Sequence, residues 1–227
     1  MGKLFDLDSP VMRFLNRLAD LLILNFLMIA CCIPVITIGA AHTAMHYVLL
    51  KMVRGEEGYL IRGFFKSFKT NFKQATVLWL IMLLVVLVYI GDALIFHYSL
   101  LQFPKALVIA VVVIAILLLM TAVYVFPLQA RFENSIKNTL KNAMILAFAN
   151  LPKTILMLVF YALPLVIGYF WAYSLIFVIM FGITVPAYGA AWLYSGIFKK
   201  FEPEEEEVSD LDFSINVDQE NGEIDGQ

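Results

Sequence analysis

The chain has 227 residues, of which 62% are hydrophobic and 15% are charged. Soluble domains carry about 25% charged residues, so this composition excludes an ordinary soluble enzyme and indicates a polytopic membrane protein. Eleven of the 18 acidic residues lie in residues 202–227, which leaves seven acidic against 16 basic residues elsewhere. That basic excess suits contact with anionic lipid headgroups, and no nucleic-acid-binding motif accompanies it.

Residues 1–17 form a short polar leader, which we expect to remain in the cytoplasm, and residues 18–201 form the predicted transmembrane helical domain. The first apolar run, residues 21–38, contains Pro34, which removes a helical hydrogen bond. It is either one kinked helix or a hairpin whose second arm covers residues 37–51. The basic residues of the leader and of residues 51–73 all prefer the cytoplasmic side, which favours the hairpin. Its second arm is rich in small residues that allow close helix contact in lipid.

Residues 61–75 have the pattern of a basic amphipathic helix at about 100° per residue. One side carries Ile61, Phe64, Phe65, Phe68 and Phe72, and the opposite side carries Arg62, Lys66, Lys69 and Lys73. This pattern predicts an interfacial helix on the cytoplasmic leaflet, with lysines at the headgroups and phenylalanines at the acyl boundary. The alternative is a helix that packs on a soluble core.

Residues 76–96 and 106–126 are the next two predicted crossings, with Pro104 placed where the second helix can begin. Pro127 is expected to end or kink that helix. Residues 131–151 form a second basic segment containing Lys137 and Lys141. Residues 66–75 and 134–143 match at four of ten positions without gaps. Either an internal duplication or the lysine rhythm shared by basic amphipathic helices explains this match.

The last predicted hairpin has arms at residues 152–168 and 174–198, joined by an aromatic turn suited to the outer interface. Pro164 and Pro186 are expected to kink these arms. The acidic tail, residues 202–227, has a composition typical of disorder. The whole pattern predicts an all-α polytopic bundle of six transmembrane helices in three hairpins, with both termini in the cytoplasm. If the first run is one kinked helix, the number of crossings is five.

Three segments carry a resemblance to a known family: PVMRFLNRLADLLILN, CCIPVITIGAAHTAMHYVLLKMVRGEEGYLIRGFFKSFKTNFKQAT and FPLQARFENSIKNTLKNA. The chain resembles the YesL family of bacterial integral membrane proteins over residues 9–201. The resemblance implies a multi-pass plasma-membrane protein, with family members encoded beside carbohydrate-uptake and polysaccharide-degradation functions. It implies no catalytic residue and no cofactor. The acidic tail departs from the compact ending of that family.

Polar groups within the apolar runs are candidate functional residues, because ionisable side chains are costly in a membrane. They are Asp20, Asn25, His42, His46, Asp92 and His97. His42 and His46 have the spacing of two metal ligands on one helical face, but the sequence favours hydrogen bonding between helices as their role. Asp92 and His97 are placed to reach water near the outer end of their crossing, where a proton or substrate path is possible. Asp20 and Asn25 are expected to cap or bridge the first hairpin.

The sequence lacks a phosphate-binding GxxxxGK loop and a GxSxG motif, which counts against an ATPase or a hydrolase. We therefore expect a non-enzymatic accessory or permease-like component linked to carbohydrate uptake or utilisation, without a cofactor. Its expected partners are anionic lipid and a transporter subunit or a second copy. The docking residues are Arg62, Lys66, Lys69, Lys73, Lys137 and Lys141. The alternatives are an intramembrane enzyme or metal-dependent protein centred on His42 and His46, and a secondary transporter acting as an oligomer.

Overall fold

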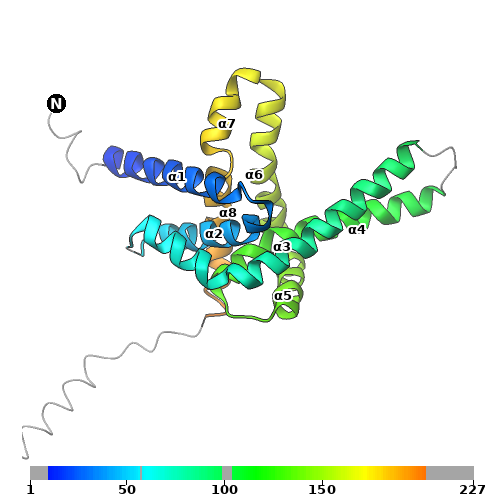
Figure 1. The fold of residues 1–227 in the computed structure, drawn as a ribbon, viewed down its shortest axis with the longest axis horizontal. Helices are drawn as coiled ribbons and strands as arrows, with labels where there is room; N and C mark the ends of the chain where they lie inside the picture. Colours follow the sequence, from blue (N-terminus) through cyan, green and yellow to red (C-terminus); the bar gives the residue numbers. More distant parts are fainter. Residues whose placement is uncertain (1–9, 57, 99–103, 203–227) are drawn as a thin grey trace, which may run out of the picture. The chain divides into compact units, whose positions relative to one another are not determined.

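The structure is a computed structural model that describes residues 10–56, 58–98 and 104–202. These residues form helices joined by short turns, and no strand occurs among them (Figure 1). The all-helical prediction is therefore confirmed for this part of the chain. The acidic tail beyond residue 202 and the first nine residues of the leader lie outside the described residues.

The chain divides into a large unit, Met1–Ser195, and a small unit, Gly196–Gln227. In the described part of the small unit, the last helical turn passes into a hydrogen-bonded turn. The amides of Lys200 and Phe201 donate there to the carbonyls of Ile197 and Phe198. All the sites considered below lie within the large unit.

The first apolar run forms two helices, as the hairpin prediction requires. Helix α1 (Pro10–Cys32) ends just before Pro34, the short 3-10 helix η2 (Val35–Thr37) follows, and α2 (Ile38–Arg54) begins directly after it. The Thr37 hydroxyl donates to the carbonyl of Pro34 at 2.6 Å, within the turn. Pro34 therefore separates two helices, and the alternative of one kinked helix is wrong.

Helix α3 (Leu60–Tyr98) contains both the basic segment and the following apolar run in 39 continuous residues. Figure 1 shows that it bends between its cyan N-terminal part and its green C-terminal part. No glycine or proline separates the two parts of the sequence, so nothing stops the helix there. Residues 61–75 are therefore helical, as predicted, and they continue into the following apolar run as one long helix. Their position at the membrane interface stays a prediction.

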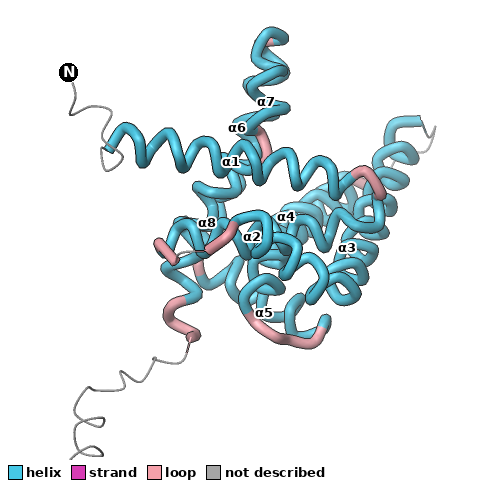
Figure 2. The backbone as a smooth tube through the Cα atoms, turned by 60° about the vertical axis from the view of Figure 1, so that its left-hand side comes forward, coloured by secondary structure: helices cyan, strands magenta, loops and turns pink. Residues whose placement is uncertain are grey.

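Small residues let α2 approach α3 closely, as the sequence predicts. Ala40, Ala41 and Ala44 are completely buried in α2. A Cβ atom added at Gly39 would overlap the backbone carbonyl of Ala75 in α3. Helix α2 packs against α1, α3 and α4 (Figure 1, Figure 2). It is therefore the central element around which the first half of the chain is assembled.

Helix α4 (Lys105–Arg131) begins immediately after Pro104, as predicted, and continues through Pro127. Of the two outcomes expected at Pro127, a helix end is wrong, and a kink stays a prediction. Helix α5 (Ile136–Ala149) follows, and its N-cap is Ser135, whose hydroxyl accepts a hydrogen bond from the Asn138 amide at 3.3 Å. The second basic segment therefore begins its helix with a local capping signal that the sequence contains.

Helix α6 (Leu151–Phe170) is followed by η3 (Ala172–Ser174), and the returning arm is divided into α7 (Leu175–Phe181) and α8 (Thr184–Phe198). The two helices meet at 47°. The break lies just before Pro186, which suits a proline in the first turn of a helix. The returning arm is therefore interrupted near Pro186, as predicted, by a complete break between two helices.

Four helices of the described chain are long and apolar enough to cross a membrane, namely α1, α3, α4 and α6. A fifth crossing results if the bent pair of α7 and α8 forms one span. These helices fit a membrane protein. The predicted count of six is not confirmed, because α2 has 17 residues and is not among the candidate spans.

Candidate functional site

Asn25 is a completely buried residue of α1 that bridges the break between α7 and α8. Its Nδ2 atom donates to the Ile179 carbonyl at 2.8 Å, and its Oδ1 atom accepts from the Thr184 amide at 3.3 Å. Asn25 therefore provides a hydrogen-bond partner for one backbone group on each side of the break. The expectation that Asn25 bridges the first hairpin is wrong, because its partners lie about 150 residues further along the chain.

Thr184 completes this contact from the other side. Its hydroxyl donates to the Leu21 carbonyl at 3.0 Å and lies 3.4 Å from Asn25 Oδ1. Buried polar groups without partners are costly, and here the groups at the break are paired within the protein. Asn25 and Thr184 therefore hold α1 against the broken helix and are structural residues in this arrangement.

His42 and His46 lie on one face of α2, with their ring centroids 6.2 Å apart. His42 stacks on Phe126 of α4 at 5.4 Å, and His46 Nδ1 lies 3.0 Å from the Tyr194 hydroxyl of α8. His46 therefore joins α2 to α8 through a hydrogen bond with Tyr194.

A metal site at these histidines would need further ligands. Among the residues that the structure describes, no group of three or more His, Cys, Asp or Glu side chains is arranged to hold a metal ion. The side chain of His97 lies outside the described part. In the described residues, the two histidines have an aromatic ring and a tyrosine hydroxyl as their neighbours, which suits helix packing.

Asp92 is a half-buried residue in the apolar part of α3, six positions before its end at Tyr98. Its carboxylate makes no hydrogen bond or ion pair with another described residue. A proton or substrate path through Asp92 and His97 therefore stays a prediction.

Asp20 lies away from Asn25, on the wall of a cavity of about 900 Å³ between α1, α2 and α3. Arg62 and Lys66 line the same cavity. The structure thus brings together one predicted intramembrane residue and two predicted docking residues. Asp20 belongs with the basic end of α3, and it contributes no bond to the first hairpin.

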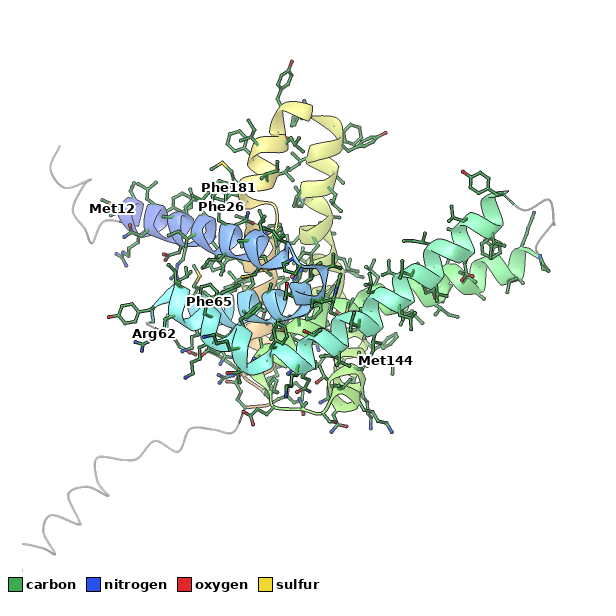
Figure 3. All side chains as sticks on the ribbon, viewed as in Figure 1. Met12, Phe26, Arg62, Phe65, Met144 and Phe181 are labelled. Atoms are coloured by element: carbon green, nitrogen blue, oxygen red, sulfur yellow. The ribbon has the colours of Figure 1, made fainter. Side chains whose placement is uncertain are left out.

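All six predicted docking residues are exposed: Arg62, Lys66, Lys69 and Lys73 on α3, and Lys137 and Lys141 on α5. We call this set the basic surface. Figure 3 shows side chains that end in nitrogen gathered along the first part of α3 and along α5. Within the described chain, none of the six forms a salt bridge. Their charges are therefore available to an external anion.

The apolar side of residues 61–75 in α3 is more buried within the protein than the sequence predicts. Phe64 is completely buried, whereas Ile61 and Phe65 are 52% and 40% exposed. The rings of Phe64, Phe68 and Phe72 form a continuous row, with centroid distances of 6.2 and 5.6 Å. Only part of this side is therefore free to contact lipid.

A buried polar network ties the two basic segments together, centred on Gln129 near the end of α4. Gln129 Nε2 donates to Asn71 Oδ1 at 3.2 Å, and Gln129 Oε1 accepts from the Thr139 hydroxyl at 3.4 Å. A second link joins the Gln74 side chain to the Asn134 carbonyl. Asn71 and Thr139 occupy matching positions in the ungapped alignment of the two segments. The basic parts of α3 and α5 are therefore held side by side.

Sequence reasoning missed Gln129, Thr184 and Tyr194 as site residues. Gln129 did carry a signal, because it is an amide side chain near the end of the most apolar helix, where polar groups are costly. Thr184 and Tyr194 carried none, since both residue types are common in such helices. Their importance follows from contacts with Asn25 and His46, which lie far away in the sequence.

Residues 21–93 match the model of a family described as a protein of unknown function, DUF624. YesL proteins belong to this family. The matched region contains α2 and nearly all of α3, and therefore most of the cavity lining. A search of curated proteins gives no match, and neither does a search of solved structures.

Proposed function

We propose that this protein is a non-enzymatic accessory or permease-like component of a bacterial plasma membrane. In this proposal the basic surface faces the cytoplasm and docks a subunit of a solute-uptake system. The resemblance to the YesL family suggests that the solute is a carbohydrate. The apolar helices anchor the protein in the membrane, and the surface formed by α3 and α5 contacts the partner subunit.

The observation that supports the proposal best is the pairing of the two basic segments. Gln129 contacts both Asn71 and Thr139, so that lysines far apart in the sequence share one surface. Because those lysines lack salt bridges to the described residues, each retains its charge for a partner. An acidic surface on a transporter subunit would gain several charge contacts at once.

An intramembrane metal enzyme is the main alternative. It depends on His42 and His46, whose described neighbours are Phe126 and Tyr194. Metal analysis of the purified protein and of a His42→Ala, His46→Ala double variant tests this alternative. Metal that is present in the native protein and lost in the double variant would support it.

Capture of partners from detergent extracts tests the docking proposal. The test variant changes Lys69, Lys73, Lys137 and Lys141 to Glu, and the matched control changes the same four residues to Arg. Both variants keep four long charged side chains, but only the first reverses the charge. These positions lie outside the lining of the cavity between α1, α2 and α3, so the variants leave that cavity unchanged.

We expect the native protein and the Arg control to capture the same membrane-transport subunit, and the Glu variant to lose it. Opposite charges steer and stabilise such complexes, whereas like charges oppose them. If the native protein captures no transporter subunit or regulator above background, the proposal is wrong. It is equally wrong if the Glu variant captures the same partner as strongly as the native protein.

A further inference from the structure

The cavity between α1, α2 and α3 has the size of a small-molecule site. Its volume of about 900 Å³ lies within the range of about 300–1,000 Å³ that is usual for ligand pockets. It lies at the turn between α2 and α3. Its charged lining residues are Arg17, Asp20, Lys51, Glu56, Arg62 and Lys66.

The charges in this cavity do not cancel. Glu56 is already engaged, because its carboxylate lies 3.8 Å from Lys51 and 4.0 Å from Arg54. Asp20 then remains as the one unengaged carboxylate of the described lining, against Arg17, Arg62 and Lys66. The cavity therefore attracts an anion.

The cationic groups retain donors for that anion. Arg17 uses one N–H for the Met52 carbonyl, at 2.8 Å from Nη1. A guanidinium has five N–H donors in a planar fork, so several are left. Arg62 and Lys66 have no hydrogen bond or ion pair from their side chains to the described residues. All three side chains line the same cavity, so each has donors for an anion bound there.

Three glycines, Gly55, Gly58 and Gly63, line the cavity. A Cβ atom at Gly63 would lie 3.9 Å from the ring of Tyr47, which is also a lining residue. A larger side chain at Gly63 would therefore occupy space beside Tyr47 at the cavity.

We propose that this cavity binds the phosphate ester of a polyol. Arg17, Arg62 and Lys66 hold the phosphate by charge-assisted hydrogen bonds, and arginine provides the two-pronged contact that phosphate oxygens favour. Asp20 accepts hydrogen bonds from the hydroxyl groups. The same chemistry occurs in the headgroup of phosphatidylglycerol and in a free ester such as glycerol 3-phosphate. The site shares Arg62 and Lys66 with the basic surface, but it requires no docked protein partner, so its test can fail independently of the proposed function.

The first arm of the test measures glycerol 3-phosphate binding by calorimetry, with the full chain in phosphatidylcholine nanodiscs. The cavity variant is Arg62→Gln with Lys66→Gln. The matched control is Lys69→Gln with Lys73→Gln, which removes the same charge from the same helix outside the cavity. We expect at least tenfold weaker binding in the cavity variant and less than twofold change in the control.

The second arm measures phosphatidylglycerol retained by the detergent-purified protein, using native mass spectrometry of the same variants. Retention that is lost only in the cavity variant, without binding of the free ester, identifies the lipid as the ligand. Gly63→Leu keeps every charge but fills the cavity, and it should abolish binding in whichever arm is positive. Thermal unfolding checks that each variant is folded. Absence of binding in both arms, or equal loss in the cavity variant and its control, overturns the proposal.

Discussion

Gly39 lies directly against the backbone carbonyl of Ala75, so that α2 and α3 meet without an intervening side chain. This contact holds the central helix against α3, which carries four of the six residues of the basic surface and part of the cavity lining. Close approach of this kind depends on the absence of a Cβ atom, because even one methyl group would overlap the carbonyl oxygen.

Gly39→Ala should therefore destabilise the protein strongly for so small a change. Overpacking typically costs about 1–3 kcal/mol, which a thermal-unfolding assay in detergent resolves. Gly91→Ala is the matched control, because a Cβ atom at Gly91 in α3 meets nothing within 4 Å. Equal unfolding temperatures for the two variants would show that α2 and α3 are not in close contact.

Asn25→Leu should destabilise the junction of α1 with the broken helix. Leucine cannot accept from the Thr184 amide or donate to the Ile179 carbonyl. A buried group left without a partner costs about 1–3 kcal/mol. The control is Asn16→Leu, an exposed position on the same helix. The bridging role is refuted if Asn25→Leu unfolds at the same temperature as this control.

Gln129 and Thr139 should be energetically coupled. Gln129→Met removes the acceptor of the Thr139 hydroxyl and the donor to Asn71. Thr139→Val removes the hydroxyl that donates to Gln129. A double-mutant cycle of unfolding free energies should give a coupling of about 0.5–1.5 kcal/mol, the net worth of a typical hydrogen bond. Additive effects would mean that the network does not join α4 to α5.

The sequence predicts most helix ends because the signals are local. Pro34 separates α1 from α2, and Pro104 precedes α4. The continuity of α3 was harder to predict, since a change from amphipathic to uniformly apolar sequence resembles a boundary between two elements. Pro127 was misleading for a related reason, because neighbouring helices tolerate a proline inside a long apolar helix.

The candidate site depends on contacts that local patterns do not contain. Composition and periodicity identify the lysines of α3 and α5, but they do not reveal that Gln129 holds the two segments together. Likewise, the sequence identifies Asn25 as an amide within an apolar run, yet its partner Thr184 is 159 residues away. Sequence reasoning therefore finds unusual residues, and the fold is needed to find what each one contacts.

The central claim is that the basic surface faces the cytoplasm, and single-cysteine labelling tests it most directly. One cysteine replaces Lys137 in a Cys31→Ala, Cys32→Ala background, and intact cells are treated with an impermeant maleimide. Tyr173→Cys is the control, because this residue is 96% exposed in the turn after α6, on the opposite side in the proposed topology. We predict labelling at 173 in intact cells and at 137 only after permeabilisation. Labelling at 137 in intact cells would contradict the account.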